Sequence, residues 1–259
     1  MIDKYTFVSL RRRSATKVCA FFRIMLLLGA LGTAQNVFAF SFVPTAAEFQ
    51  AWPLHCKAIY VGAMPDESAQ FAHSVPSAAV KKWMKFAKEH GGAWHYCAGI
   101  VQLNRARVEA DPKKREYAYE RAAAQAAFSY ARTSPDKPFR AKMATIMAMA
   151  YRGLGKYEIA TKILETSISE HPSYPDAYTA LALIHRDANH KEQERDILLK
   201  GNEATGGKSA EIHYFLGLVY LDMEDIPAAS KHAKEAYRLG YPLRGLMSKL
   251  KRLDGSSKH

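Results

Sequence analysis

Apolar side chains recur at helical spacing between Ala141 and Pro242, in segments that come in pairs joined by short polar turns. The pairs themselves repeat every 34 or 35 residues, so that Ala148, Ala182 and Gly217 occupy equivalent positions in successive copies. One pair of helices cannot bury its own apolar face, because that face has no partner until a second pair stacks on it. The pattern therefore predicts helical hairpins stacked in an array.

The copies at residues 141–172 and 210–242 agree best. In both, small residues stand where the two helices of a hairpin must approach closely, and aromatic residues or Leu fill the gaps beside them. The equivalent positions are Ala148, Tyr151, Ala160, Leu164, Ser167 and Pro172 in one copy, and Gly217, Tyr220, Ala229, Ala233, Ala236 and Pro242 in the other. This pattern resembles the tetratricopeptide repeat (TPR) family. The resemblance implies an all-α fold, a right-handed α-solenoid of helix-turn-helix repeats.

Two further copies match less well. In the copy at about 175–207, Glu194 stands where the family has a small residue and Gly201 replaces a helix-favouring alanine, so we expect looser packing there. An earlier copy combines "HYCAGIVQLNRARVEA" with "YERAAAQAAFSYARTSP". The polar segment "DPKKRE" (111–116) is expected to lengthen the turn between its helices. The array thus holds about four repeats.

The flanking patterns divide the chain into four parts. Residues 1–39 read as a signal peptide, 40–90 as an N-terminal helical cap, 91–242 as the TPR-like array, and 243–259 as a C-terminal capping helix and tail. The segment "LRGLMSKLKRL" has Leu on one face and Lys or Arg on the other, so its apolar face is expected to cover the last hairpin. Basic amphipathic helices also lie on anionic membranes, which is the alternative role for this segment.

The amino-terminal leader has the features of a secretory signal. Basic residues precede the apolar run "IMLLLGALGTA", and "VFA" then supplies the small residues that signal peptidase needs, which places cleavage before Phe40. The run is shorter than the roughly 20 residues of a membrane-spanning helix, so an uncleaved anchor is the weaker alternative. We therefore expect an exported, periplasmic protein without stable membrane insertion.

Export changes the charge of the working protein. The whole chain has a net charge of +12, and the leader contributes six Lys or Arg and one Asp. Cleavage leaves 31 basic and 24 acidic residues, a net charge of +7. This moderate excess favours acidic partners or surfaces but does not by itself indicate nucleic acid, which we do not expect as a partner.

Cysteine usage identifies one candidate site near the junction of cap and array. Cys19 leaves with the leader, and Cys56 with Cys97 would form a disulfide in an oxidising compartment, closing a loop of about 40 residues. His55 and His95 stand beside these cysteines, so a metal site of all four residues is an alternative, although the spacing is unlike that of ordinary structural sites. A reactive thiol with one of the histidines as base is another.

No other pattern predicts chemistry. "GNEATGGKS" (201–209) lacks the first glycine of a phosphate-binding loop, and His171, His185, His190, His213 and His232 have no metal-binding spacing. No nucleophile, base and oxyanion site is assembled, so we expect no catalytic residue, no metal and no cofactor.

The resemblance instead implies a concave groove lined by the first helix of each hairpin, which holds an extended peptide or a helix of a partner protein. Helical spacing places twelve residues in this groove: Lys142, Thr145, Met149, Arg152, Asp176, Thr179, Leu183, Arg186, Glu211, Tyr214, Leu218 and Leu221. Among them, Lys142, Arg152 and Arg186 could pair with acidic side chains or a carboxyl terminus of the partner.

The function hypothesis is a non-enzymatic periplasmic scaffold or adaptor that takes part in the assembly of envelope machinery. The alternative hypothesis is a metal- or redox-active envelope protein that uses His55, Cys56, His95 and Cys97. The identity of the partner and the oligomeric state do not follow from the sequence.

Overall fold

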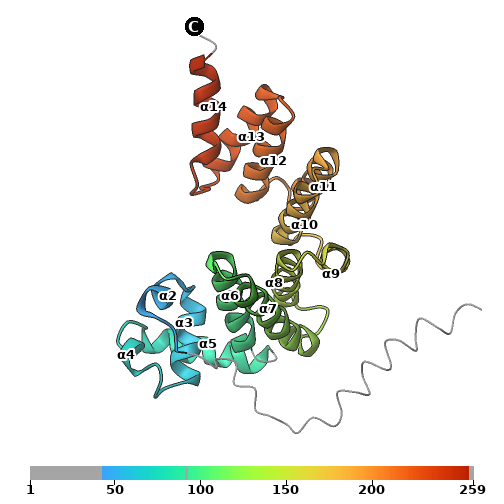
Figure 1. Ribbon diagram of the computed structural model, residues 1–259. Helices are drawn as coiled ribbons and strands as arrows, with labels where there is room; N and C mark the ends of the chain where they lie inside the picture. Colours follow the sequence, from blue (N-terminus) through green and yellow to red (C-terminus); the bar gives the residue numbers. More distant parts are fainter. Residues whose placement is uncertain (1–42, 91–92, 257–259) are drawn as a thin grey trace, which may run out of the picture. The chain divides into compact units, whose positions relative to one another are not determined.

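A computed structural model describes residues 43–90 and 93–256 (Figure 1). Every regular element within those ranges is an α-helix. The predicted signal peptide and its cleavage point before Phe40 lie outside the described residues. No described helix is both long and apolar enough to cross a membrane.

The segment before the repeats folds around an aromatic core. Its helices are α2 (Ala46–Ala51), α3 (Leu54–Ala63), α4 (Ala69–Ala72) and α5 (Ser77–Glu89). The Phe49 ring stacks on Phe71 with centroids 4.3 Å apart, and Trp52 meets Tyr60 edge-on at 5.4 Å. Such ring pairs contribute attraction beyond the area they bury, and these rings belong to a core that continues into the helices of the repeat array.

The predicted α-solenoid fold is confirmed. Successive helices pair as hairpins, and each hairpin packs on the next along the chain (Figure 1). The hairpins are α6 (Ala93–Val108) with α7 (Pro112–Arg132), α8 (Phe139–Gly153) with α9 (Tyr157–Glu170), α10 (Pro175–Asp187) with α11 (Lys191–Ala204), and α12 (Ala210–Asp222) with α13 (Ile226–Arg238).

The sequence period is also a period of backbone conformation. Gly155, Asn189 and Glu224 occupy equivalent positions in the turns of the last three hairpins, and each has a positive φ, between 57° and 70°. The next amide in each turn donates a hydrogen bond of 2.9 Å to a carbonyl five residues earlier, as from Asp225 to Tyr220. This arrangement satisfies a terminal helix carbonyl and reverses the chain in few residues.

The charged segment at 111–116 does not lengthen a turn, contrary to the expectation from sequence. It begins α7, because the Asp111 side chain accepts hydrogen bonds from the amides of Lys113 and Lys114 at 2.9 and 3.0 Å. Pro112 follows at the first helical position, where its missing amide hydrogen costs nothing. Asp-Pro here is a helix start.

The two unusual residues of the third hairpin both have a packing role. A Cβ atom on Gly201 would lie 2.6 Å from Cγ of Tyr178, so the glycine makes room for a tyrosine ring that is 1% exposed. Glu194 is 2% exposed and forms an ion pair with Arg186. Neighbouring side chains therefore pack against both positions at which the repeat pattern suggested looser packing.

The last helix, α14 (Gly245–Ser256), covers the fourth hairpin. Leu246 is fully buried against α12, where Gly217 leaves space for it: a Cβ atom on Gly217 would lie 2.4 Å from Leu246 Cδ2. Leu250 is also buried, whereas Leu243 and Leu253 remain exposed. The capping role expected for this segment thus depends on two of its leucines.

A disulfide joins the amino-terminal segment to the first hairpin. Cys56 of α3 and Cys97 of α6 are bonded, with Cα atoms 5.4 Å apart, and both residues are almost fully buried. Glu48 of α2 adds an ion pair with Arg105 of α6, at 2.5 Å between Oε1 and Nε. Covalent and ionic links therefore hold the same two parts together.

We predict that the double variant Cys56→Ser plus Cys97→Ser loses about 4 kcal/mol of unfolding free energy, because the bond closes a separation of 41 residues and restricts the unfolded chain. Urea denaturation followed by circular dichroism measures the loss. Reductant should bring the unsubstituted protein to the same midpoint and leave the variant unchanged. A midpoint that reduction does not move would contradict the prediction.

Candidate functional site

The first helices of the hairpins form one continuous face. Helices α6, α8, α10 and α12 contact one another in succession, in addition to the contacts that each makes with its sequence neighbours. We call the surface that these four helices share the first-helix face. The predicted groove residues belong to three of these helices, α8, α10 and α12.

The structure leaves most of these residues accessible. Lys142 is exposed, while Thr179 and Tyr214 are buried, at 3% and 8% exposure. The remaining residues are half-buried: Thr145, Met149, Arg152, Asp176, Leu183, Arg186, Glu211, Leu218 and Leu221. The predicted set therefore combines half-buried apolar side chains with charged ones.

The two arginines predicted to bind an acidic ligand are already engaged. Arg152 forms two hydrogen bonds of 2.7 Å with the Asp187 carboxylate. Arg186 pairs with the buried Glu194, and its guanidinium lies 5.5 Å from the Phe215 ring centroid. Each guanidinium is therefore paired with a carboxylate of its own chain. Folding brings these groups together, because Asp187 is supplied by α10 and Glu194 by α11.

Two carboxylates of the face have no such partner. Asp176 and Glu211 stand 35 residues apart, at equivalent positions in the first turns of α10 and α12. Neither forms an ion pair with any residue in the described part of the chain. The pKa of Glu211 is raised to about 7, chiefly by burial and to a lesser extent by the charge of Asp176. A hydrogen bond from Thr179 acts in the opposite direction, because it favours the ionised form. Burial therefore favours the protonated form of Glu211 well above the usual range of a carboxyl group.

Tyrosines surround this carboxylate pair. The Tyr174 hydroxyl donates a hydrogen bond of 2.7 Å to Oδ2 of Asp176. The pKa of Tyr96 is raised to about 12, chiefly by burial and to a lesser extent by the Asp176 charge. The pKa of Tyr241 is also raised to about 12, chiefly by burial and to a lesser extent by the Glu211 charge. We call the set Asp176, Glu211, Tyr96, Tyr174, Tyr214 and Tyr241 the acidic-tyrosine patch.

Sequence reasoning placed Asp176, Glu211 and Tyr214 in the groove but missed the patch. The repeat period carried part of the signal, since Lys142, Asp176 and Glu211 share one position of successive copies. Tyr96 and Tyr241 come from α6 and from the loop before α14, so only the folded chain brings them to the pair. Tyr241 does so by stacking on Tyr214, with centroids 4.2 Å apart.

The four-residue cluster proposed for metal or redox chemistry is not assembled. His55 lies with Cys56 and Cys97, all ligand atoms being within 4.8 Å, but both sulfurs are used in the disulfide. His95 faces the other way: its Nδ1 bonds to Oε1 of Gln125 at 2.6 Å and its ring lies 3.9 Å from that of Phe128. A disulfide beside one histidine retains no thiolate to bind a metal or attack a substrate.

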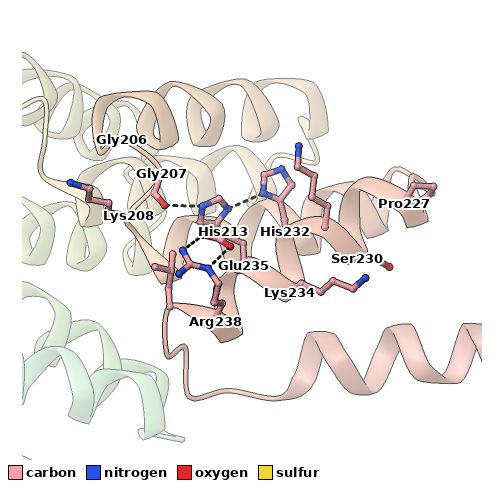
Figure 2. Close-up of a pocket in the computed structure, with 12 residues that line it drawn as sticks. Gly206, Gly207, Lys208, His213, Pro227, Ser230, His232, Lys234, Glu235 and Arg238 are labelled. Atoms are coloured by element: carbon pink, nitrogen blue, oxygen red, sulfur yellow. Dashed lines mark hydrogen bonds and ion pairs between the residues drawn. The ribbon is translucent and has the colours of Figure 1, made fainter.

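A second candidate site, missed from sequence, lies where α12 and α13 meet the loop before α12 (Figure 2). There, a cleft of about 1010 Å³ contains a pair of histidines 19 residues apart. Nε2 of His213 lies 3.1 Å from the Gly207 carbonyl, which can only accept, so this nitrogen carries a proton. Nδ1 of His213 then accepts from Nδ1 of His232, at 2.9 Å, when both rings are neutral.

Lysines surround the histidine pair. Lys208, Lys231 and Lys234 line the cleft, and its carboxylate, Glu235, is paired with Arg238. Burial, followed by the nearby His213 and Lys231, lowers the pKa of His232 to about 4. His232 is therefore held in its neutral form, in which its Nδ1–H can donate to Nδ1 of His213.

Neither a protein-family model nor a curated protein matches the sequence. Among solved structures, the chain is similar to MamA from Desulfovibrio magneticus RS-1, at 18% identity and a TM-score of 0.38, covering 61% of this chain and 92% of that one. It is similar to MamA MSR-1 at 16% identity and 0.39, covering 71% and 96%, and to MamA AMB-1 at 17% and 0.38, covering 63% and 92%.

We predict that Arg186→Met lowers the unfolding free energy by about 3 kcal/mol, because it leaves the Glu194 charge buried without a partner. The matched variant Arg152→Met breaks an ion pair whose side chains are about one quarter exposed, and should cost about 1 kcal/mol or less. Urea denaturation at neutral pH compares the two. Equal losses would show that burial of Glu194 does not govern the effect.

We predict that His232 makes the fold less stable in mild acid. Folding lowers the pKa of His232 to about 4 from the ordinary histidine value of 6.5, so the unfolded state binds more protons between these two pH values. Because of His232, the free energy of unfolding should therefore fall by roughly 1 kcal/mol from pH 7 to pH 5, a value already reduced for solvent screening.

The check is urea denaturation of His232→Gln, whose amide can still donate to His213, at several pH values. This variant should show a flatter dependence than the unsubstituted protein, and His73→Gln, an exposed control, should not. The same pH dependence in all three proteins would contradict the assignment to His232.

Proposed function

We propose that this protein is a non-enzymatic scaffold or adaptor that binds an extended peptide or a helix of a partner protein on the first-helix face. The observation that carries the proposal is the succession of contacts among α6, α8, α10 and α12, which makes one extended surface from four hairpins. Half-buried Met149, Leu183 and Leu218 supply apolar contact on it, and charged residues between them supply specificity.

We further propose that the protein acts in the periplasm, in the assembly of envelope machinery. Support comes from the leader pattern of the sequence and from the disulfide, which is the bond expected of a protein that folds in an oxidising compartment. No catalytic role is included, because the candidate thiols are bonded to each other.

Photo-crosslinking tests this proposal by position. A photoreactive amino acid replaces Leu183 or Leu218 on the first-helix face, or the exposed residues Lys162 or Lys200 on the second helices α9 and α11. We predict that the two face positions crosslink the same protein in the periplasmic fraction of native cells, and that the two control positions do not. Mass spectrometry identifies the product.

Equal crosslinking at all four positions would contradict a binding face, and so would its absence from both face positions. Circular dichroism of each variant verifies that the substitution has not unfolded the array. Recovery of the crosslinks only from the cytoplasmic fraction would overturn the proposed location while leaving the binding face in place.

A further inference from the structure

We propose that the α12–α13 cleft binds a small molecule that carries phosphate groups. The loop before α12, His213 of α12 and one face of α13 line this cleft (Figure 2). None of the twelve predicted groove residues belongs to its lining. The inference therefore goes beyond the proposed function and does not depend on it.

The packing of α13 determines which of its side chains reach the cleft. The small residues Ala229, Ala233 and Ala236 are buried on the side of α13 that approaches Gly217 of α12. The lining residues of α13 all lie on the remaining arc of the helix, at spacings that return to one side every three or four residues. They are Pro227, Ser230, Lys231, His232, Lys234, Glu235, Arg238 and Leu239.

The positive charge of the cleft is not balanced within the chain. Glu235 is the only carboxylate among the described lining residues, and it is paired with Arg238. The exposed lysines Lys208, Lys231 and Lys234 form no ion pair with any residue that the structure describes. A concave surface concentrates the field of such charges, so the cleft attracts anions.

The free cations of the cleft suit phosphate better than carboxylate. A carboxylate is bound best by the planar fork of an arginine, but the arginine of this cleft already holds Glu235. Lysine acts as a point charge, and several ammonium groups can approach the oxygens of one tetrahedral phosphate from different directions. Three free lysines from a loop and a helix therefore indicate a phosphate-bearing ligand.

The histidine pair can add a proton donor to the site. Nε2 of His213 donates to the Gly207 carbonyl at 3.1 Å, and Nδ1 of His232 can donate to Nδ1 of His213 at 2.9 Å. Nε2 of His232 then has no hydrogen bond to any described residue. A phosphate would favour a proton on this nitrogen, so that Nε2–H donates to a phosphate oxygen while Nδ1–H still donates to His213.

A metal cation fits the same residues poorly. The two Nδ1 atoms of the pair lie close enough to share an ion, but the surrounding lysines would repel it. No third His, Cys, Asp or Glu is grouped with the two histidines in the part of the chain that the structure describes. The charge of the lining therefore decides in favour of an anion.

The loop at the cleft does not bind phosphate as a glycine-rich phosphate loop does. The amides of Gly206, Gly207 and Lys208 donate to the carbonyls of Glu203, Asn202 and Thr205, so they are not available to a ligand. Recognition is left to the side chains. The cleft volume of about 1010 Å³ is that of a pocket for a whole small molecule, which leaves room for an organic part beside Pro227 and Leu239.

A nuclear magnetic resonance titration tests the site, with inorganic pyrophosphate as the probe and chloride to hold the ionic strength constant. We expect the imidazole signals of His213 and His232 to shift and saturate, while those of the exposed His73 do not move. Citrate, which has a similar charge near neutral pH, should bind at least about tenfold more weakly. No shift with pyrophosphate, or equal affinity for citrate, would overturn the proposal.

Lysine variants locate the binding. Lys231→Gln plus Lys234→Gln should weaken pyrophosphate binding at least about tenfold, since two phosphate contacts lose their charge. The matched control is Lys162→Gln plus Lys200→Gln, which removes the same charge from exposed positions on α9 and α11 and should leave the affinity unchanged. Equal losses in the two variants would mean general attraction to a basic protein and would refute a site in the cleft.

The pKa of His232 gives a readout that does not need a variant. This ring is faced by His213 and Tyr220 of α12, with Lys231 and Glu235 beside it on α13. Saturating pyrophosphate should raise the pKa of His232 from about 4 towards the ordinary histidine value, because the anion favours the charged ring. An unchanged pKa would show that phosphate does not reach the histidine pair.

The remaining comparison separates a free phosphate compound from a lipid headgroup. Vesicles of phosphatidylcholine with phosphatidylglycerol are sedimented with the protein at the same phosphate concentration. We expect Lys231→Gln plus Lys234→Gln to leave any cosedimentation unchanged, because the cleft takes the free compound. Cosedimentation that this variant abolishes, without binding of pyrophosphate, would assign the cleft to a membrane surface and contradict the proposal.

Discussion

The fold depends on close approach between helices that cannot be stable alone. Each hairpin exposes an apolar face, and only a neighbouring hairpin or cap can cover it. Small residues make that approach possible at defined points: Gly201 admits the Tyr178 ring, and Gly217 admits Leu246 of the last helix. The covering at the other end is different, because an aromatic core and a disulfide join the segment before the repeats to α6. The array is therefore closed by packing at one end and by a covalent bond at the other.

This constraint also decides which charges remain available to a partner. Packing of the helices brings Asp187 to Arg152 and Glu194 to Arg186, so the two guanidiniums of the first-helix face form ion pairs within the chain. The same packing sets Asp176 beside Glu211 without a cation. Only unpaired charge is free to attract a ligand, so Lys142, Asp176 and Glu211 matter more for binding than the two paired arginines do.

Burial acts in opposite directions on the two sites of unusual titration. It raises the pKa of Glu211 and lowers that of His232, because in both cases the neutral form loses less when water is removed. Glu211 belongs to the set proposed to contact the partner, and the Asp176 charge adds to the effect of burial there. His232 lies in the α12–α13 cleft, where His213 and Lys231 add to the effect of burial in opposing its protonation.

The repeat period, the positions of the hairpins and the pairing of the two cysteines could be predicted from the sequence alone, because each follows from local spacing or from the small number of thiols. Helical periodicity also identified which side chains share a face, as for Lys142, Asp176 and Glu211 at one repeat position. It misassigned "DPKKRE", where a capping Asp111 and Pro112 begin a helix.

Partners between elements were decided only by the tertiary structure. The pairing of Arg186 with Glu194, the separation of His95 from the disulfide and the bond between His213 and His232 all depend on which helix faces touch. Such contacts depend on the rotation and offset of packed helices. The spacing of residues along a single helix does not determine that rotation and offset. The acidic-tyrosine patch belongs to this class, since it gathers residues from α6, α10, α12 and the loop before α14 that the chain separates by more than a hundred positions.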